Sequence, residues 1–255
     1  MEKADLSLAI ITFNEEENIG RTLESICQIA KEIIIVDSFS SDKTVKIART
    51  YNATVFLEQW KGHIEQKNSA LEKCNAKWIL SLDADEVLSD ELKKNILEAI
   101  KDENSDGFFL NRKTHYLGKL MNFAWQPDKK LRLVKRSCNP NWQGLNPHDY
   151  LTIQGKTASL KGDLTHYSYK DLRHHLQKTI DYAKISARVY FENNKKASLM
   201  RLTLNPLFAF FKIYFIQLGI LDGFRGLLAA FSSMLGTFLK YSFLWELEQF
   251  SNKKQ

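Results

Sequence analysis

The sequence lacks the cysteine patterns and glycine-rich loops that mark several classes of protein. Its three cysteines, Cys27, Cys74 and Cys138, lie far apart, and no Cys-x-x-Cys pair or Cys/His cluster occurs. This spacing argues against a zinc site and against a disulfide framework. Neither a Walker A motif nor a G-x-G-x-x-G motif is present, so the usual sequence support for a kinase or a dehydrogenase is missing.

Two further absences concern the location of the protein. Residues 1–6 contain no basic start followed by an apolar run, which is not typical of a signal peptide. Together with the scattered cysteines, this predicts a cytoplasmic protein. No stretch reaches the roughly 18–20 uncharged apolar residues that are needed to span a bilayer. We therefore expect no membrane-spanning helix.

The net charge of +6 is distributed unevenly along the 255 residues. Residues 195–255 hold eight Lys or Arg against three acidic residues, which leaves +5 in this tail and +1 in the preceding 194 residues. The tail is also apolar and aromatic, which is typical of helices that lie on an anionic membrane surface. We expect residues 201–249 to make that contact; the alternative is a helical hairpin that packs on the rest of the chain or forms a dimer. The tail has no dense Lys/Arg stripe, so no nucleic-acid partner is expected.

Apolar runs alternate with helical patterns over the first hundred residues. The predicted strands are 6–11, 32–37, 54–56 and 78–83, with helices capped by Asn14 and Asp42 and over about 63–75 and 89–101. This alternation predicts an α/β fold with right-handed βαβ units and a mostly parallel central sheet. Short strands follow up to about 168, and then a helix over about 171–194. We predict an α/β domain over 1–195 and an amphipathic helical region over 196–255.

Acidic and polar residues follow three of these strands at the point where each strand ends. They are Asn14 and Glu15 after the first strand, Asp37 after the second, and Asp83 and Asp85 after the fourth. Parallel sheets bind ligands beyond the carboxyl ends of their strands. We therefore expect these residues to converge on one site.

The segment Asp83-Ala84-Asp85-Glu86 places three carboxylates within four residues. Their mutual repulsion indicates that a cation lies among them. Mg²⁺ or Mn²⁺ suits such oxygen ligands and commonly binds phosphates as well. The alternative is an acidic turn that caps the next helix. Similarly, Asp37 either hydrogen-bonds a nucleotide, with Thr12 in the same pocket, or belongs to an ordinary turn.

These motifs resemble, in order and spacing, those of family 2 glycosyltransferases with the GT-A fold. The resemblance rests on Ile10-Ile11-Thr12-Phe13-Asn14-Glu15, Asp37-Ser38, Trp60-Lys61-Gly62, Gln66-Lys67-Asn68 and Leu82-Asp83-Ala84-Asp85-Glu86. Further segments resemble bacterial lipopolysaccharide core β-1,4-glucosyltransferases: Leu131-Arg132-Leu133, His148-Asp149, Gly162-Asp163-Leu164-Thr165-His166-Tyr167 and Leu221-Asp222-Gly223. The resemblance covers nearly the whole chain.

The resemblance implies a role for each matching residue. The uridine would be held by Thr12, Asn14, Glu15 and Asp37, and the diphosphate by Lys67 and Arg132. Asp83 and Asp85 would engage the ribose and the metal, with Asp85 the more direct metal ligand and His166 a further metal or diphosphate ligand. Asp149 would be the general base. Two departures are that Phe13 replaces a common Tyr and that Asp149 is one methylene shorter than the usual Glu.

The resemblance also implies a function. It predicts an inverting, metal-dependent hexosyltransferase that moves glucose from UDP-glucose to a heptose of the lipopolysaccharide inner core, peripheral on the cytoplasmic face of the inner membrane. Three alternatives stay open. They are transfer to another lipid-linked acceptor such as polyprenyl phosphate, a catalytically silent glycosyltransferase-like binding module, and a nucleotidyltransferase.

Simpler interpretations exist for several of these residues. Arg132 alternates with two leucines, so it either contacts phosphate or is a solvated charge on the polar side of a strand. His166 is either a ligand or part of a core pair with Tyr167, and His148 either has a direct role or only shapes its loop. Trp125 and Trp142 either stack on a sugar or belong to the core. We assign Trp60 and Trp78 to packing.

Overall fold

The computed structural model describes residues 3–101, 104–145 and 148–252. The chain forms two compact units, an α/β unit of Met1–Lys113 with Asp128–Tyr167, and a helical unit of Thr114–Pro127 with Ser168–Gln255. This division differs from the predicted boundary after residue 195. The reason is that helix α5 (Leu172–Glu192) buries Ala187 against Tyr241 and Leu244 of the C-terminal helix, so it belongs with the tail.

Four parallel strands make up one half of the central sheet. They run in the order β3 (Thr54–Leu57), β2 (Ala30–Asp37), β1 (Ala4–Thr12) and β4 (Trp78–Asp83). Helices α1 (Ile19–Ile26), α2 (Thr44–Thr50) and α3 (His63–Glu72) connect them. The predicted strands and their βαβ connections are therefore confirmed. The capping role predicted for Asn14 is wrong, because α1 begins only after Asn18 at its N-cap.

The other half of the sheet is antiparallel, so the whole sheet is mixed. Beyond β4 come β8 (Lys129–Lys135), β6 (Gly107–Tyr116), β11 (Thr157–His166) and β5 (Glu86–Leu88). β8 is antiparallel to both β4 and β6, and β11 is antiparallel to β5. The remaining elements of this part are α4 (Asp90–Ala99), η1 (Arg136–Cys138) and the two-stranded sheet of β9 (Asn141–Leu145) with β10 (His148–Thr152).

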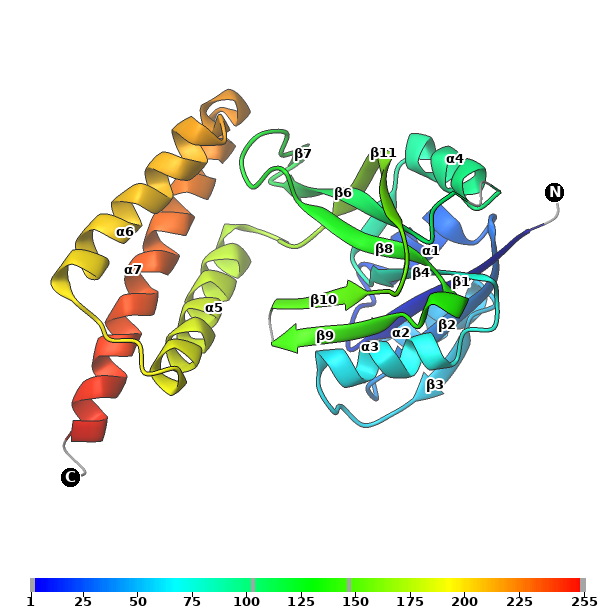
Figure 1. Cartoon of the computed structure of the whole chain (residues 1–255), viewed down its shortest axis with the longest axis horizontal. Helices are drawn as coiled ribbons and strands as arrows, with labels where there is room; N and C mark the ends of the chain where they lie inside the picture. The colour runs from blue at the N-terminus through cyan, green and yellow to red at the C-terminus, as the bar shows by residue number, and fades with distance from the viewer. Residues whose placement is uncertain (1–2, 102–103, 146–147, 253–255) are drawn as a thin grey trace. The chain divides into compact units, whose positions relative to one another are not determined.

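Both faces of β1, β2 and β4 are buried, which explains their continuous apolar runs. Leu8 and Ile10 of β1 point to the face that α1 and α4 cover, while Ala9 points to the face that α3 covers (Figure 1). Full burial of a Leu or Ile side chain contributes about 1.5–3 kcal/mol to folding. This two-sided core fixes the carboxyl ends of β1, β2 and β4 beside one another.

The helical unit consists of α5, α6 (Leu199–Phe211), η2 (Lys212–Ile216), η3 (Gly219–Asp222) and α7 (Phe224–Asn252), with the short strand β7 (Lys119–Leu120). The carboxylate of Asp222 ties this tail to the 114–127 segment. It accepts hydrogen bonds from the backbone N–H groups of Asn122, Phe123 and Ala124 at 3.0, 3.1 and 2.8 Å. The Leu221-Asp222-Gly223 motif therefore has a structural role here.

Two helical segments of the tail, Leu199–Ile216 and Phe224–Phe250, are long and apolar enough to cross a membrane by length and composition alone. The sequence prediction did not single them out, because it required an uncharged run and Lys212 and Lys240 interrupt these segments. Only 11% and 28% of the two segments are buried, so much of their apolar surface is exposed.

Candidate functional site

The carboxyl ends of β1, β2 and β4 bring the predicted polar residues into one region of the α/β unit. Thr12 at the end of β1 lies opposite Asp37 of β2, and Ile11 lies opposite Asp83 of β4. Because the strands are parallel and in register, their acidic ends meet at one edge of the sheet. The prediction that these residues converge at one edge of the sheet is therefore confirmed.

A cavity of about 580 Å³ opens at this edge of the sheet, and we call it the first cavity. It is lined by Ile11, Thr12, Phe13, Glu15, Ser38, Trp60, His63, Lys67, Asp83 and Ala84. Four of the predicted site residues, Thr12, Glu15, Lys67 and Asp83, are therefore in its wall. The packing role predicted for Trp60 is wrong, since its side chain is 48% exposed and meets His63 edge-on in this wall.

His63 is a lining residue that the sequence analysis did not identify. It is the first residue of α3 and follows Gly62, whose φ of +127° is a conformation that only glycine adopts readily. The tripeptide Trp60-Lys61-Gly62 therefore turns the chain so that Trp60 and His63 face the same cavity. The motif was visible in the sequence, but the side chain that follows it was not singled out.

Asp37 and Asn14 hold the loops at the edge of the site in place through hydrogen bonds of their side chains. Asp37 is fully buried, and its carboxylate accepts hydrogen bonds from the Thr12 hydroxyl at 2.7 Å and from the hydroxyl and N–H of Ser40 at 2.6 and 2.8 Å. Asn14, with a φ of +56°, accepts from the N–H of Ser41 at 2.9 Å. These hydrogen bonds fit the interpretation of the Asp37 segment as an ordinary turn. Neither Asp37 nor Asn14 lines the first cavity.

Lys67 joins two acidic residues that come from distant parts of the chain. Its ammonium lies 3.0 Å from Oδ1 of Asp83 and 2.7 Å from Oδ2 of Asp149. It also sits over the ring of Trp142, 4.1 Å from the ring centroid. The Lys67 side chain is only 9% exposed. Paired and nearly buried charges of this kind hold a fixed geometry, which is what a binding site requires.

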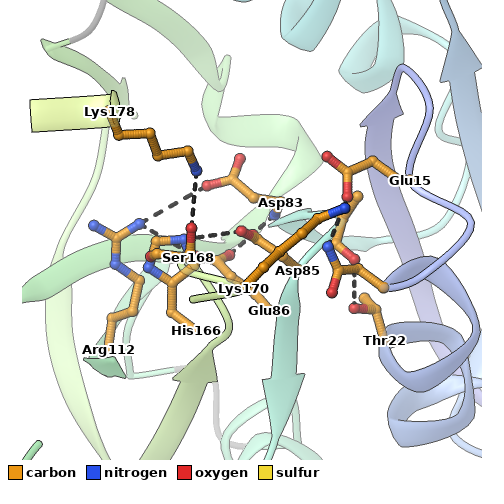
Figure 2. A network of polar contacts seen from close by, with 12 residues as sticks. Glu15, Thr22, Asp83, Asp85, Glu86, Arg112, His166, Ser168, Lys170 and Lys178 are labelled. Atoms are coloured by element: carbon orange, nitrogen blue, oxygen red, sulfur yellow. Dashed lines mark hydrogen bonds and ion pairs between the residues drawn. The ribbon is translucent and has the colours of Figure 1, made fainter. Parts of the chain in front are cut away.

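A network of charged side chains surrounds Asp83 and Glu86 at the end of β4, and Figure 2 shows these two acids together with Arg112. Arg132 lies 2.7 Å from Oδ2 of Asp83 and 2.8 Å from Oε1 of Glu86, and its side chain is 3% exposed. Arg112 lies 3.4 Å from Glu86 on the other side. Arg132 is therefore not a solvated charge. Strand β8 is buried on both faces, so the alternation with leucine does not mark a polar side.

These cations also determine the ionisation of Asp83. Burial acts to raise the pKa of Asp83, but the charges of Arg132, Lys67 and Arg112 outweigh it and hold the pKa well below the usual range. The repulsion predicted within the Asp83–Glu86 segment is thus relieved by arginine and lysine. The Nε of Arg132 is buried and has no hydrogen-bond partner among the described residues, so this arginine keeps one donor unused.

A second cavity of about 560 Å³ lies on the other side of the Lys67–Asp83 pair. Lys67 and Asp83 line both cavities. Asp149 and Trp142, from the two-stranded sheet, are in the second cavity's wall, together with the cations Arg112, Lys129, Lys130 and Arg132. The side chain of Trp142 is buried at 3% exposure, in agreement with the core interpretation, while its ring supports Lys67. His148 belongs to the chain trace of β10, but its side chain lies outside the described part of the structure.

Asp85 and His166 form a separate pair of possible metal ligands, side by side in Figure 2. His166 Nε2 lies 3.3 Å from Asp85 Oδ2, and the two side chains are 16% and 18% exposed. Among the described residues, no group of three or more His, Cys, Asp or Glu side chains is arranged to hold a metal ion. Asp83 does not complete the pair, because it is engaged by Lys67 and Arg132.

The Asp85–His166 pair nevertheless fits Mg²⁺ or Mn²⁺. Two neighbouring ligands of an octahedral ion, each about 2.0–2.1 Å from it, stand about 3 Å apart. The observed 3.3 Å between Nε2 and Oδ2 is close to that separation. Mg²⁺ sites commonly use one or two carboxylates, here Asp85, and complete their shell with water and substrate phosphate. The residues present therefore fit an ion that arrives with a phosphorylated ligand.

Comparison with known proteins identifies the family to which this chain is similar. The family model "Glycosyl transferase family 2" matches residues 7–154. The uncharacterized glycosyltransferase RT0209 of Rickettsia typhi is 31% identical over 254 residues, covering 95% of this chain and 87% of the relative. The lipopolysaccharide core biosynthesis glycosyltransferase LpsC of Rhizobium meliloti is 27% identical over 249 residues, covering 93% of this chain and 90% of LpsC.

A solved structure shows the same fold at low sequence identity. The mannosyltransferase PcManGT of Pyrobaculum calidifontis, in complex with GDP-Man and Mn²⁺, superimposes with a TM-score of 0.55 at 13% identity. The match covers 99% of this chain and 89% of PcManGT. The fold of this chain is therefore the GT-A fold, with a mixed central sheet and C-terminal helices.

Proposed function

The chain belongs to glycosyl transferase family 2, and we propose that it is an inverting enzyme that transfers glucose from UDP-glucose to a heptose of the lipopolysaccharide inner core. The observation that carries this proposal is the double ion pair of Lys67, which links Asp83 of the first cavity to Asp149 of the second. A transferase for two substrates needs two adjoining cavities with charged groups at their junction, and this chain has both.

The first cavity is the proposed donor site. Its wall offers Thr12 and Glu15 to the nucleoside, and the exposed rings of Phe13 and Trp60, at 58% and 48% exposure, to a planar base. At its inner end, Lys67 offers an ammonium to the diphosphate. Arg132, with its unused Nε donor, lies in the wall of the adjoining cavity, 2.7 Å from Asp83. Asp37 supports Thr12 from behind through the hydrogen bond between their side chains.

The proposed metal ligands are Asp85 and His166. When bound, a divalent cation would supply positive charge to the nucleotide diphosphate as it leaves. The arginines and lysine around Asp83 add fixed positive charge on the same side of the site. Groups of this kind that are in place before the reaction are an effective way to stabilise developing negative charge.

Asp149 is the proposed general base. Its Oδ2 lies 2.7 Å from the Lys67 ammonium, which fixes the position of the carboxylate, and its side chain is 15% exposed in the second cavity. The carboxylate takes the proton of the acceptor hydroxyl while the hydroxyl oxygen attacks the anomeric carbon and the bond to the diphosphate breaks. General base catalysis of this kind contributes about 10²–10⁴-fold. One displacement inverts the anomeric centre, so an α-linked donor gives a β-linked product.

The second cavity is the proposed acceptor site. Its lining includes five cations, among them Arg112, Lys129 and Lys130, against the two acids Asp83 and Asp149, and this net positive lining favours an acceptor that carries anionic groups. The similarity to LpsC supports a lipopolysaccharide core acceptor. A polyprenyl phosphate acceptor is the main alternative, since it is also anionic and lipid-linked. Either acceptor places the enzyme at the cytoplasmic face of the inner membrane, with residues 201–249 in contact with the membrane.

A nucleotide-release screen tests this proposal. UDP-glucose, other UDP-sugars and GDP-mannose are each incubated with Mn²⁺ and a heptose-containing core oligosaccharide, and the nucleotide released is measured. We expect UDP release from UDP-glucose that requires the acceptor. Pyrophosphate release in a parallel reaction with UTP and glucose 1-phosphate would instead indicate a nucleotidyltransferase. Release from GDP-mannose alone would refute the UDP donor. Absence of release from every donor indicates a binding module without activity.

A further inference from the structure

The turn between α5 and α6 of the helical unit gathers four cations. They are Lys195, Lys196 and Arg201, together with Lys240 of α7. Within the described residues none of the four forms an ion pair with an acidic side chain. The carboxylate of Glu248 does contact this turn, but its partner there is the backbone N–H of Ala197, which donates to it at 2.8 Å. The positive charge of the turn is therefore available to an anionic ligand.

Aromatic rings and a backbone carbonyl hold three of these cations in place. The Lys240 ammonium sits 4.6 Å from the ring centroids of both Tyr190 and Tyr241, and the Lys195 ammonium sits 4.7 Å from that of Tyr190. Arg201 donates from Nη1 to the carbonyl of Lys196 at 2.6 Å. A cation on an aromatic face is partly ordered before any ligand arrives. This preorganisation lowers the entropic cost of binding an anion.

Three of the four cations, Lys195, Lys196 and Arg201, line a cavity of about 670 Å³. Its lining consists of Tyr190, Asn194, Lys195, Lys196, Ala197, Ser198, Met200, Arg201 and Tyr241. The cavity holds three cations, two tyrosines and two small polar side chains, and no acidic residue is in its wall. Its size and chemistry suit a phosphate group and the polar group esterified to it.

A large apolar surface begins at the edge of this cavity. Leu199 and Met200 are 77% and 66% exposed, and the surface continues along α6 with Leu204, Leu207, Phe208 and Phe211, each at least 50% exposed. Contiguous apolar patches of this kind mark contacts with membranes or other proteins. Cations beside such a surface lie where the headgroups of a bilayer meet its hydrocarbon.

We propose that the cavity at the α5–α6 turn binds the phosphate of an anionic lipid headgroup while α6 lies in the membrane interface beside it. Charge complementarity favours this occupant, because Lys195, Lys196 and Arg201 need a negative partner and the adjoining α6 surface needs an apolar one. A single anionic lipid supplies both. The site gives the membrane contact a defined and saturable component, which a diffuse attraction to the whole basic tail does not have.

Vesicle flotation of the full-length protein tests the proposal. The probes are vesicles of phosphatidylcholine alone and of phosphatidylcholine with 30% phosphatidylglycerol, a fraction of about one lipid in three. We expect the protein to prefer the anionic vesicles. The triple variant Lys195→Ala, Lys196→Ala, Arg201→Ala should bind these vesicles roughly 10–100-fold more weakly, because each cation near an anionic surface contributes a few-fold.

Two matched variants decide between a defined site and overall charge. The triple variant Lys46→Ala, Lys94→Ala, Lys161→Ala removes the same charge from exposed positions of the α/β unit and should bind within about twofold of the parent. The charge-conserving variant Lys195→Arg, Lys196→Arg, Arg201→Lys should keep most of the binding. Equal losses in both alanine variants, or equal binding to neutral and anionic vesicles, overturn the proposal. So does an absence of vesicle binding, and a dimer in solution would then identify a second copy as the occupant. No sugar donor is present, so sugar transfer is not tested in this experiment.

Discussion

The ammonium of Lys67 lies 2.7 Å from Oδ2 of Asp149, although the two residues are 82 positions apart in the chain. The same ammonium lies 3.0 Å from Asp83. One lysine therefore connects the end of strand β4 with the two-stranded sheet of β9 and β10. Since Lys67 and Asp83 line both cavities, this contact defines the junction at which a donor and an acceptor would meet.

Replacing Lys67 by alanine should lower kcat/KM for sugar transfer by roughly 10²–10³-fold, because it removes a fixed positive charge and leaves two carboxylates without their partner. Steady-state nucleotide release measures the change. The matched control is Lys73→Ala. Lys73 follows the same helix but pairs with Glu58, 2.6 Å away. Similar losses in both variants would mean that Lys67 acts only through the stability of α3.

Removing Arg132 should mainly destabilise the fold. Arg132→Met leaves Glu86 fully buried, with Arg112 at 3.4 Å as its remaining cation among the described residues. Leaving one buried charge without its partner costs about 3–5 kcal/mol of unfolding free energy, and Arg112 should keep the loss near the lower end. Urea denaturation measures it. The double variant Arg132→Met, Glu86→Gln should recover part of the loss, and no recovery would show that the pair is not coupled in this way.

The Asp85–His166 pair predicts a specific dependence on metal. Asp85→Asn should abolish the Mn²⁺-stimulated turnover, and His166→Gln should raise the Mn²⁺ concentration needed for half-maximal activity by about 10-fold or more. A titration of activity against Mn²⁺ measures both effects. Asp90→Asn is the control, because Asp90 is a fully exposed acid in the first turn of α4. Near-normal Mn²⁺ dependence of Asp85→Asn would refute the metal role.

His175 predicts a pH dependence of stability in the helical unit. Burial, assisted by the nearby His174, lowers the pKa of His175 to about 4, and its Nδ1 lies 2.7 Å from the hydroxyl of Tyr116. In the unfolded chain His175 takes up a proton near pH 6.5, whereas in the folded chain it stays neutral at that pH. Its contribution to the free energy of unfolding is therefore fully present above about pH 6.5 and is lost as the pH falls toward 4. We expect a loss of about 2 kcal/mol between pH 7.5 and pH 5 from this group.

The variant His175→Phe isolates that contribution. Its stability at pH 7.5 should be lower than that of the parent, because the Tyr116 hydroxyl loses its partner. The decline between pH 7.5 and pH 5, however, should become smaller by about the stated amount. Urea denaturation at both pH values gives the comparison. An unchanged decline would mean that His175 does not take up a proton on unfolding in this range.

The parallel half of the sheet was predictable because its signal is local. Strand β4 spans the predicted residues 78–83, and the acidic positions Asp37 and Asp83 sit at strand ends as expected. The neighbouring strands bury both faces, so the apolar runs are continuous. Local periodicity and the position of polar residues after each strand are sufficient to identify such a site.

The rest of the fold and of the site depends on contacts between residues that are distant in the sequence. Hydrophobic periodicity carries no information about such contacts. Arg132 follows a pattern typical of a half-exposed strand, but its side chain is buried and pairs with Asp83 and with the fully buried Glu86. Tryptophan is typical of a protein core, but the turn at Gly62 before α3 leaves the side chain of Trp60 exposed. Helix α5 was assigned to the α/β domain because nothing in its own sequence reveals that it packs against α7.

Asp149→Asn separates proton removal from donor binding, because Asp149 is the proposed base while other residues bind the donor. UDP-glucose affinity, from calorimetry, and acceptor-dependent UDP release are measured side by side on the parent, Asp149→Asn and Asp149→Glu. We predict an unchanged affinity, a fall in kcat of about 10²–10⁴-fold for the asparagine variant, and substantial activity for the glutamate variant. Parental turnover in Asp149→Asn would contradict the account, since the base would then lie elsewhere.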